Sequence, residues 1–299
     1  MAPFGWGTKE WFEDKFKNAA HGYDEWGNQW RGSQQLRYVS CLGMIQHILP
    51  ADRKRNILDI GCGLGDLTAR LCQGNPQHAV FGVDLSENAV KWGARHYPCV
   101  KFSIGALPEL SFHDHKFDLV LCLEMIYYLS DEDRIKAIHH IIRVLKDDGY
   151  ILLSSTLSRD GRYLDEYVVT DELKNIFSIE DIRYEYRNYY ETHLGRLIRR
   201  MDKSRQLLTM DRTDSESVNV TSEHDEKKHI LLRLRERKLV KHVMIHLIDV
   251  TLPILRYALK AKLPTVLISG VVKWLYPDSG KKRITILGKK INGCRAYSR

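Results

Sequence analysis

The sequence predicts an α/β fold built on a mostly parallel sheet with helices on both faces. Short apolar runs of five to seven residues recur along the chain, separated by stretches whose apolar side chains repeat at helical spacing. The first run ends in the glycine-rich segment Gly61–Gly65, as expected where a strand turns into a helix. Strands that alternate with helices pair in parallel through right-handed crossovers.

The predicted elements follow in order along the chain. A helix from Ser33 to Leu49 is closed by Pro50, and a later helix begins at Ser86, whose hydroxyl can accept from an early helical N–H. Further helices are expected from Asp66, at 131–145 and at 170–177. Strands are expected at 56–60, 79–83, 100–104, 117–123, 150–154, 182–190 and 283–287, with a turn at Asp148–Gly149 between a helix and a strand.

The positive charge of the chain is unevenly placed. The net charge is +8, and residues 191–283 alone hold 20 Lys and Arg against 11 Asp and Glu. Such a segment indicates an anionic partner, which is a phosphate-bearing substrate, a membrane surface or a nucleic acid. The alternative interpretation is an ordinary solvated helical face.

Residues 226–276 combine cations with an apolar helical face. Apolar side chains recur at helical spacing from Ile230 to Leu247, and an apolar stretch broken by Pro253 and Pro264 follows. This pattern is typical of elements that lie on a membrane surface. The competing prediction, which we favour, is that the apolar face packs on the rest of the chain or on a second subunit of a homodimer.

Three features predict a cytoplasmic protein, and peripheral contact with a membrane surface remains an alternative. No run of about 18 uninterrupted apolar residues is present, which argues against a spanning helix. Residues 1–11 lack the basic start and apolar run of a secretory signal. The six cysteines form no CxxC pair, so reduced thiols are expected.

Two acidic residues accompany the glycine segment and define a nucleotide site. Asp59 precedes Gly61 by two positions, and the glycines are spaced GxGxG up to Gly65. Glycines allow the backbone to approach a ligand closely, and a carboxylate beside them suits a cationic amino acid moiety. Asp84 ends the second strand, where it can accept two hydrogen bonds from ribose hydroxyls.

These blocks resemble the class I S-adenosylmethionine-dependent methyltransferase family. The resemblance covers residues 57–68, 80–89, 117–131 and 141–155 in that order. It implies a Rossmann-like sheet of seven strands that ends in an antiparallel pair. It also implies four parts of the chain: an N-terminal cap or lid at 1–50, a cofactor-binding core at 51–190, a basic helical insertion near the substrate mouth at 191–282, and a final strand and tail at 283–299.

The resemblance also implies which residues hold S-adenosylmethionine. Asp84 would hold the ribose, Leu85 would pack on the adenine, and Ala106 stands where many members have an acidic residue. The other positions that it assigns to the cofactor are Asp59, Gly61, Gly63, Gly65, Leu107 and Leu123. A narrower similarity, at 24–27 and 124–129, is to the nodulation-factor N-methyltransferases, which methylate amino sugars and small amines.

Candidate catalytic residues follow the fourth strand. An amine acceptor needs only to be neutral, whereas a hydroxyl acceptor gains from a general base. Glu124 is placed best for that role, and Tyr127, Tyr128 and His193 are further candidates. Glu124 can equally make a structural hydrogen bond, and Tyr128 can serve packing alone.

Three aromatic residues of the N-terminal part can form a lid over the cofactor. They are Trp26, Trp30 and Tyr38. The alternative is that they fix the N-terminal segment to the core.

His113, Asp114 and His115 lie in a predicted surface turn, and the chemistry needs no metal, so we predict no metal site.

The sequence therefore predicts methyl transfer to an O or N atom of a small-molecule, glycan or lipid-linked acceptor in biosynthesis. An RNA or protein methyltransferase is the first alternative. It is disfavoured because no RNA-binding module and no Asn-Pro-Pro-Tyr block is present. A non-catalytic or NAD-type nucleotide-binding protein is the second.

Overall fold

The computed structural model of the 299-residue chain describes residues 5–17, 24, 26–29, 31–50, 53–158, 163–186, 197–198, 200–202, 204–205, 238–260, 273 and 281–291. They belong to two compact units. The first comprises Met1–Gln29, Gln34–Arg187 and Ser269–Arg299, and the second comprises Trp30–Ser33 and Asn188–Ile268.

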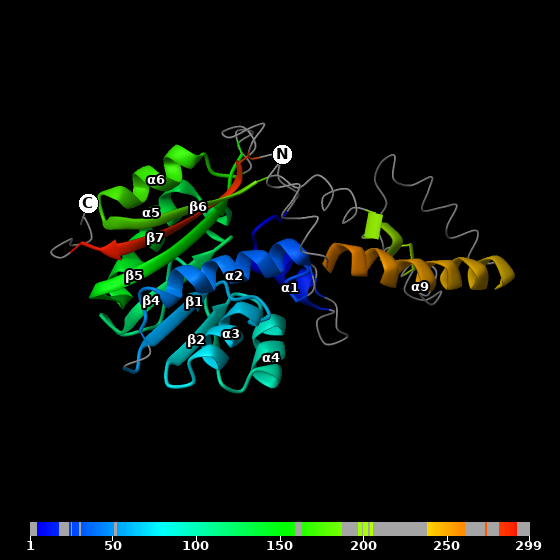
Figure 1. Ribbon diagram of the computed structural model, residues 1–299, viewed down its shortest axis with the longest axis horizontal. Coiled ribbons are helices and arrows are strands. Elements are labelled where there is room, and N and C mark those ends of the chain that lie inside the picture. The colour runs from blue at the N-terminus through cyan, green and yellow to red at the C-terminus, as the bar shows by residue number, and fades with distance from the viewer. Residues whose placement is uncertain are drawn as a thin grey trace. The chain divides into compact units, whose positions relative to one another are not determined.

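The first unit contains a seven-stranded sheet in the order β3-β2-β1-β4-β5-β7-β6. Its strands are β1 Asn56–Ile60, β2 Ala79–Asp84, β3 Lys101–Ile104, β4 Phe117–Leu123, β5 Leu145–Thr156, β6 Phe177–Tyr186 and β7 Lys281–Lys290. The pairs from β3 to β5 are parallel, and β7 runs antiparallel to both β5 and β6. The predicted mostly parallel sheet with a final antiparallel pair is confirmed (Figure 1).

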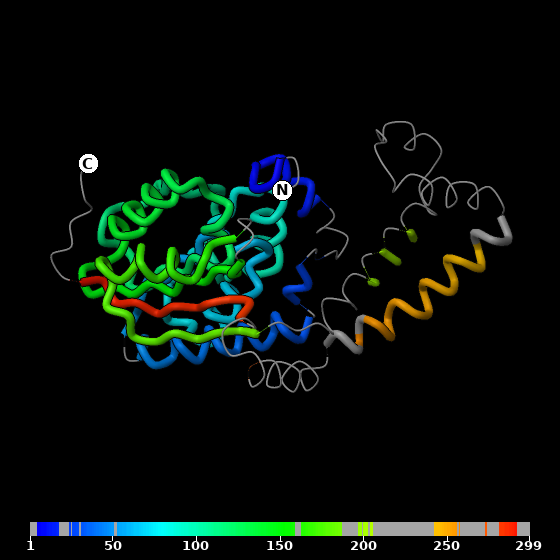
Figure 2. Tube along the Cα trace, turned by 90° about the horizontal axis from the view of Figure 1, so that it is seen from above, coloured from blue at the N-terminus to red at the C-terminus, as the bar shows by residue number. Residues whose placement is uncertain are grey.

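Helices cover both faces of this sheet. The helices that lie wholly or mainly in the first unit are α1 Lys9–Phe16, α2 Gly32–Gln46, α3 Asp66–Gly74, α4 Glu87–His96, α5 Asp131–Val144 and α6 Glu166–Lys174, with the 3-10 helix η2 Ile126–Tyr128. Figure 2 shows α2 and α5 on opposite sides of the sheet. Because apolar area is buried on both faces, the central parallel strands β1, β2 and β4 are rich in apolar residues.

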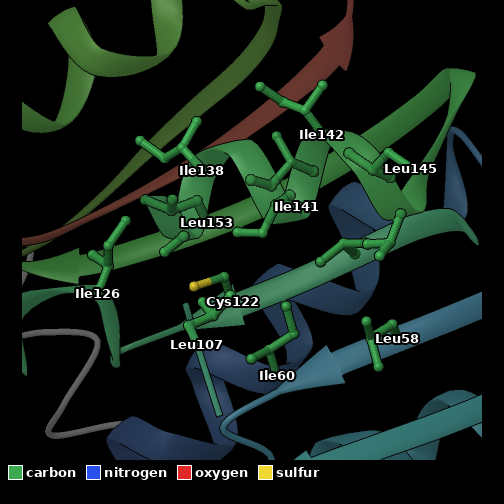
Figure 3. Close-up of a cluster of buried hydrophobic side chains, with 14 of the residues drawn as sticks. Leu58, Ile60, Leu107, Cys122, Ile126, Ile138, Ile141, Ile142, Leu145 and Leu153 are labelled. Carbon is green, nitrogen blue, oxygen red and sulfur yellow. The ribbon is translucent and has the colours of Figure 1, made fainter. Parts of the chain in front are cut away.

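The larger core lies between α5 and the sheet. Ile138 and Ile141 of α5 meet Leu153 of β5, Cys122 of β4 and Ile60 of β1, and all five are at most 4% exposed (Figure 3). On the other face, α2 and α3 bury side chains that include Tyr38, Met44, Leu67 and Leu71. The carboxyl ends of β1, β2 and β4 are therefore held in fixed positions relative to one another.

Some predicted boundaries were wrong. The helix expected at 170–177 is α6, which begins earlier because the Asp165 side chain accepts from the Tyr167 N–H at 3.0 Å. The strand expected at 182–190 begins instead at Phe177, which is 1% exposed. Asp148–Gly149 lies within β5, where the register against β4 shifts between Phe117 and Leu119.

Helix α1 was not predicted. Its N-cap is Thr8, whose hydroxyl accepts from the Trp11 N–H at 3.3 Å. Phe16 at its end is 6% exposed and packs with Leu64 and Ala89. The mean hydropathy of this short helix is low, so its apolar residues do not stand out as a helical stripe in the sequence.

The second unit contains α9, Lys238–Lys260. The predicted break at Pro253 was wrong, since this proline lies inside the helix. Pro253 lacks the N–H that would donate to the Asp249 carbonyl, but the neighbouring Ile248 and Leu252 are buried together with Ile198 and hold the helix in place. Pro264 lies outside the described residues.

The opposite side of α9 carries apolar side chains that are at least half exposed. They are Val243, Leu247, Val250, Ile254 and Tyr257. Their spacing alternates between four and three residues, which places them on one face of the helix. Within the described part of the chain, no helix has the length and apolar character needed to cross a membrane.

Candidate functional site

The glycine segment forms a tight loop between β1 and α3. Gly61, Gly63 and Gly65 all have positive φ, at 71°, 56° and 83°, which residues with a Cβ resist. The Gly61 and Cys62 N–H groups donate to the Val83 carbonyl at 2.8 and 3.0 Å, and this ties the loop to β2. Gly61 is exposed, so its backbone is open to a ligand.

Asp84, the last residue of β2, connects the loop to α4. Its Oδ2 accepts from the Gly63 N–H at 2.8 Å and its Oδ1 accepts from the Ser86 N–H at 2.9 Å. Burial raises the pKa of Asp84 to about 6, although these two hydrogen bonds lower it. The two strongest sequence signals, the glycines and this carboxylate, are therefore in direct contact.

Asp59 lies one strand away, near the end of β1. Its Oδ2 accepts from the Thr68 hydroxyl of α3 at 2.6 Å, and it is 4% exposed. Burial raises the pKa of Asp59 to about 7, with a further contribution from the nearby Asp84. Two carboxylates with raised pKa values at neighbouring strand ends favour a cationic ligand, which would stabilise their ionised forms.

Gly65 has a packing role. A Cβ on Gly65 would lie 2.5 Å from Cζ of Phe102, a residue of β3. Gly82 of β2 and Gly93 of α4 face the same ring, with closest approaches of 2.9 and 2.8 Å. These three glycines leave the space that the Phe102 ring occupies, so Gly65 allows β3 to pack closely against its neighbours.

The other positions assigned to the cofactor lie around the same strand ends. Leu85 is half-buried directly after Asp84, and Ala106 is half-buried in the segment after β3. Leu107 is 5% exposed and belongs to the core beneath α5. Leu123, the last residue of β4, is half-buried and packs toward the α2 side of the sheet.

Helix α1 lies against the glycine loop and the start of α4. The Glu13 carboxylate accepts from the Ser86 hydroxyl at 2.8 Å and from the N–H groups of Glu87 and Asn88 at 2.6 and 3.3 Å. The Phe16 ring lies 3.5 Å from the place where a Cβ on Gly63 would be. Neither residue was found from the sequence.

The residues expected as a lid occupy different environments. Trp26 packs on Phe16, with ring centroids 5.0 Å apart, so it contacts α1 beside the loop. Tyr38 is 4% exposed on α2, and Arg37 and Arg70 lie over its ring, each 5.2 Å from the centroid. Trp30 lies outside the described residues.

Glu124 follows β4 in a left-handed conformation, with φ of 58°. Its Oε1 accepts from the Ser154 hydroxyl at 2.9 Å and its Oε2 accepts from the Thr156 hydroxyl at 2.6 Å. Arg283 of β7 makes an ion pair with Oε1 at 2.9 Å and donates to Glu185 at 2.5 Å. A non-glycine residue with positive φ at a strand end is typical of functional sites.

The ionisation of Glu124 is fixed by these contacts. Burial alone raises the pKa of Glu124, but Arg283, Arg37 and the two hydroxyl donors together lower it below its ordinary value. Both carboxylate oxygens already have partners, and the group stays ionised. This favours a positioning role over proton abstraction.

Tyr127 and Tyr128 lie in η2, directly after this network. Their ring centroids are 4.7 Å apart, and Trp6 lies 4.6 Å from Tyr128. Burial raises the pKa of Tyr128 to about 12 and that of Tyr127 well above its ordinary value. His193, the remaining candidate, lies outside the described residues.

Sequence reasoning missed Arg283 as a partner of Glu124. A signal exists, since an arginine that opens the apolar run Ile284–Leu287 is unusual in a buried strand. Its partner could not be identified without the register of β7 against β5, which pairs Arg283 with Thr156.

The arrangement fits an adenosyl sulfonium ligand. The exposed Gly61 backbone and the buried Asp59 suit the cationic amino acid end, and Asp84 suits the ribose. Leu85 and Ala106 supply partly accessible apolar surface near the same strand ends.

Among the described residues, no group of three or more His, Cys, Asp or Glu could hold a metal ion. Asp114 is instead paired with Arg143 at 2.6 Å.

Known proteins resemble this core in sequence and fold. Residues 57–149 match the family model of the methyltransferase domain. Trans-aconitate 2-methyltransferase of Deinococcus radiodurans is 35% identical over 94 residues, which are 31% of this chain and 35% of that protein. The first curated relatives are matched over about a third to a half of their own length.

Two solved structures share the fold. The [4+2]-cyclase SpnF has a TM-score of 0.53 at 16% identity, covering 87% of this chain and 83% of its own. The N-methyltransferase NodS from Bradyrhizobium japonicum WM9, solved with S-adenosyl-L-homocysteine, has a TM-score of 0.51 at 17% identity, covering 60% of this chain and 91% of its own. Residues 57–149 therefore form a methyltransferase domain, and the two solved structures show that the chain shares the methyltransferase-like fold.

Proposed function

We propose that the chain transfers a methyl group from S-adenosylmethionine to an O or N atom of a small-molecule, sugar or lipid-linked acceptor. The observation that carries this proposal is the contact between Asp84 and Gly63, which joins the ribose-binding carboxylate to the glycine loop at 2.8 Å. The family match supports the reaction class, and the acceptor class rests on the sequence and on the site alone.

Each residue of the pocket has a distinct task in this proposal. Asp84 holds the ribose hydroxyls, and the Gly61–Gly63 backbone with Asp59 holds the amino acid end. Leu85 and Ala106 cover the adenine. When bound, S-adenosylmethionine supplies a methyl group activated by a cationic sulfur, so catalysis depends mainly on holding the acceptor close and in line.

Glu124 acts as a positioning residue in this proposal. It ties the end of β4 to Ser154 and Thr156 of β5 and to Arg283 of β7. In this proposal the segment that follows, η2, contributes to the acceptor side of the pocket. The residues that contact the acceptor are therefore held by a buried network and not by an exposed loop.

The second unit supports a lipid-linked acceptor. The exposed apolar face of α9, from Val243 to Tyr257, lies within the basic segment 191–283. An apolar helical face with nearby cations is typical of contact with an anionic lipid surface. A homodimer that buries the same face is the alternative.

Calorimetric titration with S-adenosylmethionine and with NAD tests the donor assignment. We expect binding of S-adenosylmethionine alone, and Asp84→Asn should weaken it by about 100-fold, because two hydrogen bonds to a charged group are worth about 3 kcal/mol or more. Asp114→Asn, at an exposed surface ion pair, is the matched control and should bind as the unmodified chain does. Tight NAD binding without S-adenosylmethionine binding would refute the proposal.

A further inference from the structure

Four half-buried aromatic residues form a cluster at the carboxyl end of β4. They are Trp6, Tyr127, Tyr128 and Tyr163, here called the aromatic cluster. Trp6 lies 4.6 Å from Tyr128 and 6.2 Å from both Tyr127 and Tyr163, and Tyr127 lies 4.9 Å from Tyr163, all between ring centroids. Their planes are inclined at several angles, from 14° between Trp6 and Tyr127 to 88° between Tyr127 and Tyr163.

The aromatic cluster adjoins the donor pocket. Ile126 is 2% exposed and anchors η2 in the core beneath α5 (Figure 3). Met125, just before it, is the side chain that a Cβ on Gly61 would meet at 3.3 Å. On the other side, Phe12 of α1 contacts Tyr128 at 5.0 Å, so α1 joins the cluster to the glycine loop.

A buried charge network that includes Glu124 and Arg283 lies next to Tyr127 of the cluster. Glu124 and Glu185 share one guanidinium, that of Arg283, through contacts of 2.9 and 2.5 Å. Burial raises the pKa of Tyr127 most, and the charge of Glu124 raises it further, so this phenol stays neutral. A neutral aromatic surface attracts a cation through the ring quadrupole.

The described groups at this end of β4 suit a nitrogen acceptor better than a hydroxyl. A hydroxyl acceptor gains from a base that takes its proton. Glu124 is held ionised with both oxygens engaged, and the pKa of Tyr128 is raised to about 12 by burial. An amine needs no such base, because it loses its proton to water before it reacts.

We propose that the acceptor carries a basic nitrogen and that the aromatic cluster, next to the Glu124–Arg283–Glu185 network, binds it as an alkylammonium group. This inference rests on the proposed function and names the acceptor class of the same site. The acceptor nitrogen gives one proton to water, uses the freed lone pair to form its bond to the methyl group, and is cationic again in the product. The aromatic faces stabilise that positive charge as it reaches the nitrogen.

Binding of a matched pair of probes to the full chain loaded with S-adenosylhomocysteine tests this. Choline is cationic, and 3,3-dimethylbutanol has the same shape without the charge. We expect calorimetry to show choline binding about 10-fold more tightly, as a desolvated cation on aromatic rings requires. Trp6→Leu and Tyr163→Leu should remove most of that preference, whereas Trp6→Phe should retain it.

Tyr167→Leu, an exposed aromatic of α6, is the control and should change neither affinity. Circular dichroism confirms that each variant is folded. Equal binding of the two probes, or a preference that survives both leucine variants, would overturn the inference. Both probes are also titrated into the chain without S-adenosylhomocysteine, so that the aromatic cluster is tested independently of the donor. Failure of S-adenosylhomocysteine itself to bind then counts against the donor assignment and not against the aromatic cluster.

Discussion

At the ends of β1 and β2, the chain keeps two carboxylates in an environment that disfavours their charge. Burial raises the pKa of Asp59 to about 7 and that of Asp84 to about 6, from an ordinary value of 3.8. The folded chain therefore binds protons that the unfolded chain has released between these values. Their contribution to the free energy of unfolding decreases as pH rises through this window and stays low above it. A cationic donor offsets this cost when it binds.

The affinity for S-adenosylmethionine should therefore increase with pH. Below about 6, where both Asp84 and Asp59 are protonated, binding must release two protons, so the dissociation constant should fall about a hundredfold per pH unit, and about tenfold per unit between 6 and 7. Above about 7, where Asp59 is also ionised, it should level off. Titration calorimetry in matched buffers measures this, and Asp84→Asn should bind weakly with a shallower slope. A flat affinity from acid to neutral pH would contradict the ionisation of Asp84 on binding.

Between elements, close approach depends on a few small residues. Phe102 of β3 fills the space left by Gly65, Gly82 and Gly93, which belong to the loop, to β2 and to α4. One aromatic ring thus sets the distance between the edge strand β3 and the glycine loop, β2 and α4. Interiors packed at this density leave no room for an added methyl group.

Gly65→Ala should reduce the free energy of unfolding by about 2–4 kcal/mol, because it combines a positive φ with a contact 2.5 Å from Phe102. Phe102→Leu should relieve part of this loss, so the double variant should lose less than the sum of the single variants. Gly74→Ala, with nothing within 4 Å, is the control and should be nearly neutral. Urea unfolding measures all four, and strict additivity would argue against the packing role of Gly65.

The Glu13 carboxylate of helix α1 makes a polar attachment to α4, in addition to the packing of Phe16 on Ala89. Glu13 accepts from the Ser86 hydroxyl and from two backbone N–H groups in the first turn of α4. A negative side chain is favoured at that position by the helix dipole. Burial raises the pKa of Glu13, but these three donors outweigh burial and hold the pKa below its ordinary value.

Glu13→Gln should loosen α1 and make exchange of the donor faster in both directions, by several-fold. The reason is that hydrogen bonds to a charged group are worth about 1.5–3 kcal/mol each and the amide replaces only part of that. Stopped-flow fluorescence of Trp11 on the same helix measures the rates. Glu10→Gln, exposed on α1, should leave them unchanged. Rates that do not respond to Glu13→Gln would show that α1 does not limit access to the pocket.

For the molecule as a whole, sequence patterns predicted the features that depend on neighbouring residues in the chain, and missed contacts between distant segments. Apolar runs predicted the strands from β1 to β4 closely, and the glycine segment and Asp84, which the sequence assigns to the donor, lie in direct contact. The contacts of Glu124 with Arg283 and of Trp6 with Tyr163 were not predicted. They join segments that meet only through the antiparallel register of β7 and the return of the N-terminal segment, and no local pattern carries that information.

In the second unit, the local sequence around Pro253 likewise does not predict the structure. A proline removes one amide donor and usually ends a helix, but Ile248 and Leu252 are buried on either side of it and α9 continues. The helix therefore presents a longer apolar face than its sequence suggests. Contact made by that face depends on the charge around it, which is positive across 191–283.

We expect the full chain to float with vesicles that contain anionic lipid and not with neutral vesicles, since apolar side chains and nearby cations act together at such a surface. Leu247→Ser with Ile254→Ser, which are 57% and 63% exposed, should reduce the bound fraction several-fold. Ile135→Ser on α5, 53% exposed in the first unit, is the control and should leave it unchanged. If the chain stays in the lipid-free fraction and the same two serines instead convert a dimer to a monomer in sedimentation, the face of α9 binds a second copy of the chain.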